Sequence, residues 1–472
     1  DSYGMSQMFE QLMRPVPPDW KQANWLAESW SIGGDPDRPV VDIHIRPGVL
    51  FHNGDALTAD DFEYAYQQQR DPKESHFSHL WTAVESFEIL SPTHFRLHLR
   101  EPDGTLVVDN LRLWAIPRRY RQQVGAEAFG RAPVGTGPWK FVSRRVKEEM
   151  RLEVFEGYWN KENRPRVRNL VMKTIPEDLT RVAAFKTGAV DLIDSIPVAM
   201  LGEIRAMPGV KTATLNTGNN IYFNLYTGPG SPFGDIRVRE AAILAVDIDS
   251  IIRKVLFGQG ERYTEVGQGS FGYDPELKPR PYDPKRARAL LAEAGYPRGF
   301  DIPCYNMNTP REPNIKELGE AVFAYLSAAG IRCKLRGLEY NAWLTTIRHA
   351  PDGAVLMDGV INGMYGHGIP GDPGTAWAQT LHSFAQGGGW GASSQTNDPE
   401  VDGLIEAQKR EMDTARREAI LRHIARLKYE RILGGISVYR PLMTFAWRDA
   451  VQFTPWAMPG IWHQMQEIGL AR

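Results

Sequence analysis

A strand, an amphipathic helix and a second strand follow one another in the C-terminal half of the sequence, and this order limits the possible folds more than any other feature. Residues 300–305 and 331–335 are short and largely apolar, as buried strands are. Residues 315–329, between them, place apolar side chains such as Leu318 and Val322 on one helical face. Because two strands joined through a helix pair in parallel, the pattern predicts an α/β unit.

Helix start signals recur in the same half of the sequence. Asp283 and Pro284 supply the N-cap and first residue of a helix that ends at a glycine. Asp235 opens a helix predicted to run to about residue 257, and Asp398 precedes a helical stretch over residues 401–431. Helices and short apolar strands therefore alternate after about residue 175.

The first part of the chain has a different pattern. Residues 40–45 and 93–99 alternate apolar with polar side chains, which is typical of half-buried antiparallel strands. Between them, Thr58 and Asp61 stand three residues apart, as in a capping box, and predict a helix that begins there. An α+β arrangement is expected for this part.

Length and charge exclude several classes of protein. A chain of 472 residues suggests about three folding units. Its 55 basic and 57 acidic residues give a formal charge of −2, so no net field attracts nucleic acid. No apolar stretch approaches the about 20 residues that cross a bilayer. We therefore expect a water-soluble globular protein.

Catalytic and metal-binding motifs are absent from the sequence. His76 and His79 have a spacing that could place two ligands on one side of a helix, but no carboxylate or thiolate pattern completes a site. Paired carboxylates such as Asp60 and Asp61 are better explained by helix capping. The prediction is a protein that is not an enzyme, with no cofactor and no metal site.

Tryptophans gather after residue 340. Trp343, Trp377 and Trp390 lie in or beside a polar, glycine-rich region over residues 362–397. Each of them either anchors a loop to the core or stacks on a ligand. A long loop in a compact fold is usually functional or mobile.

Several segments resemble, in order, the family 5 extracellular solute-binding proteins, which are the dipeptide, oligopeptide and nickel receptors of ABC importers. Each segment alone is a cap, turn or packing signal, but together they cover essentially the whole chain. The segments are Phe51-His52-Asn53-Gly54 through Phe62, Gly135-Thr136-Gly137-Pro138-Trp139, Tyr222-Phe223-Asn224, Asp235 through Ala241, Tyr282 through Tyr296, and Asn397 through Asp402.

The resemblance implies an α/β, two-lobe periplasmic-binding-protein-like fold of type II, in the large cluster with an extra inserted subdomain. Lobe one is expected at about 1–264 plus 438–472, with the antiparallel subdomain at about 30–175, and lobe two at 265–437. The hinge would lie near Tyr263 and Val438. Such a receptor closes on a small organic ligand and delivers it to a membrane permease. We expect a periplasmic or extracellular monomer that meets the membrane through the permease.

The resemblance also implies which side chains face the ligand. The expected contacts are aromatic, amide, imidazole and guanidinium groups after the glycine turn, on the strands and in the long loop. They are Trp139, Tyr222 and Asn224 from lobe one, and Tyr305, Asn306, Arg311, Tyr340, Asn362, Tyr365, His367, Trp377 and Trp390 from lobe two.

The sequence departs from the family pattern in two places. The strand and turn that normally open the family, before residues 8–13, are absent, so Asp1 is not expected to be the biological N-terminus. The aspartate that pairs with the free amine of a peptide is also missing from its expected place after residue 357. We therefore expect a peptide-like, sugar-like or opine-like ligand other than a simple free-amine dipeptide, unless Asp358 or Asp372 takes that role.

Three alternatives stay open. Two are an oligopeptide receptor and a nickel-chelate receptor of the same fold, and the third is a secreted two-domain hydrolase. The two cysteines, Cys304 and Cys333, are expected to be buried on neighbouring strands without a bridge, because a disulfide across adjacent parallel strands must meet restrictive geometry.

Overall fold

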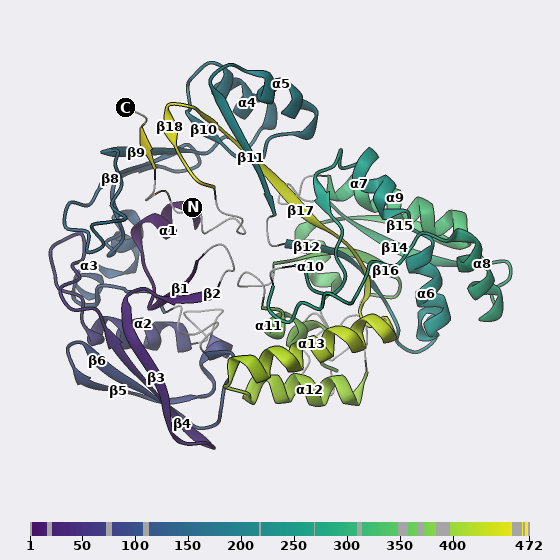
Figure 1. Cartoon of the computed structure of the whole chain (residues 1–472), viewed down its shortest axis with the longest axis horizontal. Coiled ribbons are helices and arrows are strands. Elements are labelled where there is room, and N and C mark those ends of the chain that lie inside the picture. The colour runs from purple at the N-terminus through teal and green to yellow at the C-terminus, as the bar shows by residue number, and fades with distance from the viewer. Residues whose placement is uncertain are drawn as a thin grey trace. The chain divides into compact units, whose positions relative to one another are not determined.

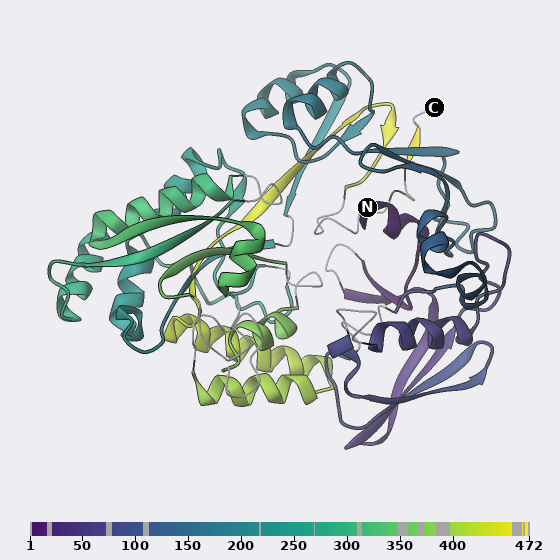
Figure 2. The same cartoon turned by 180° about the vertical axis from the view of Figure 1, so that it is seen from behind.

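The computed structural model describes residues 2–16, 21–71, 78–106, 113–216, 219–268, 270–308, 314–347, 357–366, 372–383, 397–455, 465 and 468–470. The chain divides into two compact units (Figures 1 and 2). Unit 1 comprises Asp1–Leu215 and Met443–Arg472, and unit 2 comprises Asn216–Leu442. None of the helices in the described ranges is long and apolar enough to cross a membrane.

Unit 2 is built on a mixed sheet with the strand order β17-β12-β16-β14-β15. The predicted parallel unit is confirmed, since β14 pairs in parallel with β15 and with β16. Strand β12 pairs antiparallel with both β16 and β17. Strand β17 continues into unit 1 and also pairs with β13 (Gly260–Glu261). The strands of the sheet are β12 (Asn219–Leu225), β14 (Phe300–Asn308), β15 (Ile331–Glu339), β16 (Val360–Gly366) and β17 (Gly435–Arg448).

Helices pack on this sheet around one large apolar core. Helix α9 (Ile315–Ala329) buries Leu318, Val322 and Leu326 against the strands, as its period predicts, and Figure 1 shows it beside β14 and β15. The other helices of the core are α6 (Ile236–Leu244), α7 (Ile248–Lys254) and α8 (Pro284–Glu293), with α10 (Tyr340–Ile347) against β15.

Helices α12 (Pro399–Arg410) and α13 (Thr414–Arg431) form a second apolar cluster with α11 (Gly374–Thr380), and α12 and α13 lie side by side in Figures 1 and 2. Here the predicted single stretch is two helices, because Asp413 caps a new start after Arg410. The helix predicted from Asp235 is divided in the same way by the cap at Asp247. Both predictions failed at a second N-cap inside the apolar pattern.

Unit 1 contains the predicted antiparallel sheets. One has the order β3-β4-β6-β5 and the other β7-β8-β9, all antiparallel. Helix α2 (Ala59–Arg70) packs on the first sheet, where Phe62 contacts Phe95 with ring centroids 6.0 Å apart. The strands are β3 (Ala27–Asp35), β4 (Arg38–Ile45), β5 (Val84–Ser91), β6 (His94–Leu99), β7 (Trp139–Arg145), β8 (Glu149–Val154) and β9 (Asn169–Lys173).

The rest of unit 1 consists of short elements. A small cluster forms around α4 and α5, and the end of β17 pairs with β10 and β11. These elements are α1 (Ser2–Met8), β1 (Met13–Val16), β2 (Lys21–Asn24), α3 (Arg118–Arg131), α4 (Asp178–Lys186), β10 (Leu192–Ile193), α5 (Leu201–Ala206), β11 (Val210–Asn216), β18 (Val451–Gln452) and β19 (Gly469–Leu470).

The capping box at α2 is confirmed. The backbone N–H of Thr58 donates to Asp61 Oδ2 at 2.9 Å, and the Asp61 N–H faces the Thr58 side chain. The other carboxylate oxygen of Asp61 accepts from the Arg118 N–H at 2.8 Å. One side chain thus joins the starts of α2 and α3, which explains why this aspartate is buried.

The compact units differ from the predicted lobes at both boundaries, by far the most at the first. Residues 216–264 were predicted in lobe one, but β12, α6 and α7 share the core of unit 2. The chain passes between the units at 215/216 and at 442/443, whereas the sequence placed the passages near Tyr263 and Val438. The lobe boundaries themselves stay a prediction.

Two sequence motifs meet at His52. Its Nδ1 accepts from the Gly135 N–H at 3.2 Å, so the proton resides on Nε2, which donates to the Gly137 carbonyl at 2.9 Å. Glycine is needed at both positions, because an added Cβ would lie 2.0 Å from the Met8 carbonyl oxygen at Gly135 and 2.5 Å from the Gln7 carbonyl oxygen at Gly137. Burial lowers the pKa of His52 to about 4, although the hydrogen bond to Gly137 opposes the shift.

The expectation of unbridged cysteines is wrong. Cys304 and Cys333 form a disulfide with their Cα atoms 5.3 Å apart, a common separation for such bonds. The register pairs Cys333 with Ile302, which projects from the same face of β14 as Cys304, so the two side chains can meet. The neighbouring strands were predicted correctly, but only Cys304 is fully buried.

The first prediction concerns this disulfide. Thiol titration of the denatured, unreduced protein should find no free thiol. Replacing both cysteines with alanine should lower the free energy of unfolding by about 3–4 kcal/mol, because the bridge closes a loop of 29 residues in the unfolded chain. Reduced wild-type protein is the matched control and should lose the same amount. Two thiols in the unreduced protein would contradict the bridge.

The second prediction concerns His52. Because its folded pKa lies below the ordinary value of 6.5, the neutral form stabilises the fold above that pH. Stability should be lost as the pH falls from 6.5 towards 4, by at most about 3 kcal/mol from this group. Urea unfolding at several pH values should show a weaker acid dependence in His52→Gln than in wild type.

The control is His423→Gln, at a half-exposed histidine on α13. This variant should keep the acid dependence of the wild type. An equal pH dependence in wild type and His52→Gln would show that His52 does not titrate in this way.

Candidate functional site

Unit 2 contains a small cavity beside strands β12 and β17. Three of the residues predicted from the sequence, Tyr222, Asn224 and Trp377, lie together in its wall. The cavity encloses about 30 Å³. Its full lining is Asn220, Tyr222, Asn224, Tyr263, Glu265, Trp377, Thr380, Leu381, Lys428, Gly434, Gly435, Ile436 and Ser437.

Asn220 is the unusual member of this wall. Its side chain is 2% exposed, yet neither its Oδ1 nor its Nδ2 has a hydrogen-bond partner among the described residues. A buried amide left unpaired costs about 1–3 kcal/mol, so such groups normally have a partner. The Asn220 amide can therefore donate to, and accept from, a ligand group that carries both an acceptor and a donor.

An ion pair occupies another part of the wall. Lys428 of α13 contacts Glu265, and both side chains are largely buried, at 13% and 10% exposed. The Ser437 hydroxyl donates to Glu265 at 3.2 Å. Because the two charges compensate each other, the cavity presents no net charge to a ligand.

Strand pairing positions Tyr222 in the wall. In the antiparallel register Tyr222 stands opposite Gly363 of β16. A Cβ at Gly363 would lie 2.6 Å from the Tyr222 hydroxyl, so a residue larger than glycine would push the ring away. Trp377 enters from α11 and is 3% exposed within the cluster formed by α11, α12 and α13.

Asn306 and Asn362 were predicted as ligand contacts, and the structure uses both within the core. Asn362 Nδ2 donates to Asn306 Oδ1 at 2.7 Å, and Asn362 Oδ1 accepts from the Met307 N–H at 2.7 Å. Asn306 Nδ2 donates to the Lys316 carbonyl at 2.9 Å. These bonds tie β14, β16 and the start of α9 together, which is a structural role.

Tyr305 and Tyr340 lie outside the cavity wall. The Tyr305 hydroxyl donates to Asp358 at 2.5 Å and accepts from Arg336 at 3.2 Å. Burial and the bond to Asp358 raise the pKa of Tyr305 to about 12. Tyr340 stacks on Trp343, with ring centroids 5.9 Å apart.

Asp358 and Asp372, the two alternatives for the missing aspartate, already have hydrogen-bond or ion-pair partners. Asp372 forms a two-point ion pair with the buried Arg417, at 2.5 and 3.2 Å. Asp358 accepts from Tyr305. Asp372 is therefore neutralised by Arg417, whereas Asp358 has one of its two oxygens occupied by a hydrogen bond.

Comparison with known proteins agrees with the fold and the motifs. Residues 21–372 match the family described as "Bacterial extracellular solute-binding proteins, family 5 Middle". The chain belongs to this family. It is therefore a solute-binding protein, as the resemblance predicted.

Relatives of this family 5 protein differ in the ligands that their names give. Heme-binding protein A of Haemophilus influenzae is 28% identical over 80% of this chain and 72% of its own length. The dipeptide-binding protein of Escherichia coli is 25% identical over 76% of this chain and 70% of its own length. The structure of NikA from Brucella suis with Fe(III)-EDTA superposes with a TM-score of 0.86, at 23% identity, over 100% of this chain and 95% of that one. These matches establish the two-lobe α/β fold.

The other predicted site residues whose side chains the structure describes do not line the cavity of this family 5 protein. Trp139 is fully buried in unit 1, in a cluster with Met8, Phe9 and Met150. Arg311, His367 and Trp390 lie outside the described residues. Of the histidine pair considered as metal ligands, His76 also lies outside them, and the side chain of His79 is not described. Tyr365 lies on β16 in register with Asn220, and its side chain is not described.

The cavity residues that sequence reasoning missed include the polar and charged Asn220, Glu265 and Lys428. Asn220 could have been found, because it precedes Tyr222 and Asn224 by steps of two on one strand and so shares their face. Glu265 and Lys428 are 163 residues apart, and no local pattern joins them.

A buried carboxylate in unit 1 was also missed. Glu10 accepts hydrogen bonds from Trp25 Nε1 at 2.6 Å, from the Tyr158 hydroxyl at 2.8 Å and from Trp159 Nε1 at 3.1 Å. Burial raises the pKa of Glu10 although these bonds oppose the shift. The donors occupy both oxygens, so Glu10 fixes the aromatic side chains around it.

Proposed function

We propose that this receptor binds a small organic ligand through the Asn220 cavity and releases it, chemically unchanged, to the permease of an ABC importer. The unpaired Asn220 amide carries the proposal, because a ligand group would satisfy both of its polar atoms. We further propose an extracytoplasmic monomer that meets the membrane through its permease. The family description, which names extracellular proteins, supports this location.

The wall of the cavity favours a neutral or internally balanced polar group. Asn220 offers an NH₂ group with two donors and a carbonyl acceptor. Tyr222 and Trp377 offer aromatic surface, and Lys428 neutralises Glu265. An ammonium group buried without a carboxylate partner is strongly disfavoured. A sugar-like or opine-like compound, or a blocked peptide, therefore fits better than a free-amine dipeptide.

The size of the cavity means that it holds one group of the ligand. Its about 30 Å³ exceeds the about 10–15 Å³ that a single water needs, so it takes a group of a few atoms. A whole ligand of dipeptide size needs several hundred Å³, so it must make most of its contacts elsewhere. Closure of two lobes, which the family resemblance implied, would supply those contacts and is the mechanism that we propose.

The alternatives lead to different measurements. A hydrolase would convert a bound compound, whereas a receptor releases it unchanged. Mass spectrometry after incubation of the complex should therefore find the compound intact. A nickel-chelate receptor would co-purify with its metal. An oligopeptide receptor would bind free-amine peptides tightly, and the Glu265 and Lys428 variants described below test that case.

The third prediction concerns Asn220. Native mass spectrometry of the gently purified protein should identify a carried-over compound, and calorimetry should then measure its affinity for stripped protein. Asn220→Leu should weaken this affinity at least tenfold, because a buried hydrogen-bonding amide is lost. The stability of the free protein should not fall, since the variant removes an unpaired buried amide.

Asn341→Leu, at an exposed amide on α10, is the control and should change neither quantity. Small-angle scattering of the same complex should show a smaller radius of gyration than the free protein. Tight binding that Asn220→Leu leaves unchanged would contradict the cavity as the site, whereas an unchanged radius would contradict closure alone.

The fourth prediction concerns the charge balance. A mixed library of free-amine di- and tripeptides should not bind the wild type with submicromolar affinity. In Lys428→Met, Glu265 loses its cationic partner, so a ligand ammonium can replace it and peptide affinity should rise at least tenfold.

Lys409→Met, at an exposed lysine paired with Glu406 on α12, is the matched control and should behave as wild type. Submicromolar peptide binding by the wild type that disappears in Glu265→Gln would reverse this proposal, since it would make Glu265 the ammonium anchor.

A further inference from the structure

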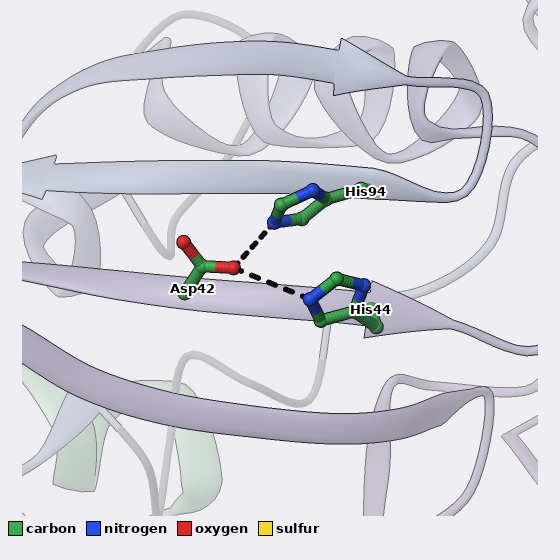
Figure 3. A group of neighbouring side chains, drawn as sticks. All are labelled: Asp42, His44 and His94. Carbon is green, nitrogen blue, oxygen red and sulfur yellow. Dashed lines mark hydrogen bonds and ion pairs between the residues drawn. The ribbon is translucent and has the colours of Figure 1, made fainter.

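The open face of the four-stranded sheet in unit 1 carries a compact group of possible metal ligands. Along β4 and β6, alternate side chains such as Ile43 and Phe95 point into the core. The opposite face presents Asp42, His44 and His94, which Figure 3 shows pointing toward one another from two neighbouring strands. None of these residues belongs to the proposed ligand cavity.

Strand register brings the three side chains together. His44 stands directly opposite His94, and Asp42 lies two residues before His44 on the same face. Asp42 Oδ1 contacts His94 Nε2 and lies 3.5 Å from His44 Nε2. The imidazole rings are stacked with their centroids 3.9 Å apart. All three ligand atoms lie within 4.8 Å of one another.

We propose that Asp42, His44 and His94 bind a divalent transition-metal ion. Two imidazole nitrogens and one carboxylate oxygen form a ligand set that suits Zn²⁺, Cu²⁺ and Ni²⁺ better than Ca²⁺ or Mg²⁺. Three protein ligands leave the remaining positions to water, as in open metal sites.

Only a small adjustment would complete the site. Two atoms that are each about 2.1 Å from one ion lie at most about 4.2 Å apart, and the three ligand atoms here lie within 4.8 Å of one another, so at most a small shift is needed. The His44 side chain is 50% exposed, so its ring can turn without disturbing the core. Asp42 and His94 are already in contact.

The groups around Asp42 include some that favour and some that oppose metal binding. Arg96 Nε donates to Asp42 Oδ2 at 2.5 Å, which fixes the carboxylate and leaves Oδ1 toward the imidazoles. Burial raises the pKa of Asp42, but the bonds from Arg96 and His94 outweigh it and keep the pKa below its ordinary value, so the group is ionised. The positive charge of Arg96 opposes a cation, and Glu88, opposite Arg96 on β5, offsets part of that charge.

The fifth prediction tests the site on the full chain, stripped of metal with a chelator. Calorimetric titration with Zn²⁺ should show one saturable equivalent at micromolar concentration, and Co²⁺ should give a d–d absorption band. His44→Ala, His94→Ala and Asp42→Asn should each weaken that equivalent at least tenfold. Zn²⁺ should raise the melting temperature of the wild type, but not that of His44→Ala.

His98→Ala is the matched control, because His98 lies on the same face of β6 and pairs with Glu88 at 2.7 Å. This variant should keep the wild-type isotherm. If His94→Ala does not fold, His44→Ala decides, since its side chain is half exposed. Absence of micromolar binding, or an isotherm that His44→Ala leaves unchanged, would overturn the proposal.

Discussion

The two faces of strand β12 determine most of what unit 2 can do. Ile221, Phe223 and Leu225 point into the main core and are fully buried, whereas Asn220, Tyr222 and Asn224 line the cavity. Because β12 pairs on one side with β16 and on the other with β17, its register also fixes both neighbours. A slip by one residue would exchange core and cavity side chains, so folding and binding depend on the same pairing.

Charge compensation is the second constraint on the site. Glu265 pairs with Lys428 and Asp372 with Arg417, while Asp358 accepts a hydrogen bond from Tyr305. Each of these acids therefore already has a partner in the free protein. In the described part of the cavity wall, the buried side chain that lacks a partner at both of its polar atoms is the Asn220 amide, and amides distinguish ligands by hydrogen-bond geometry rather than by charge. Selectivity of this kind would separate solutes of similar size and charge.

Local signals predicted the fold well and the site less well. The capping box at Thr58, the proline start at Asp283 and the parallel pairing of β14 with β15 could all be read from a few consecutive residues. Tyr222 and Trp377 were predicted because aromatic residues in strands and loops are common ligand contacts, and both lie in the cavity wall, although their contact with a ligand stays a prediction. The Glu265–Lys428 pair could not be found, since it depends on how α13 packs against a distant loop. Asn306 and Asn362 bond to each other, which no local pattern reveals, and their contact with a ligand stays a prediction.

The disulfide changes the covalent topology of the strand–helix–strand unit. Cys304 and Cys333 lie on either side of α9, so the bridge turns the helix and the two strand segments next to it into a closed ring. A protease that cuts the chain once within this ring produces two pieces that stay joined through sulfur. The strands β14 and β15 therefore remain neighbours after a single cut, and a nicked receptor can keep the core on which its cavity is built.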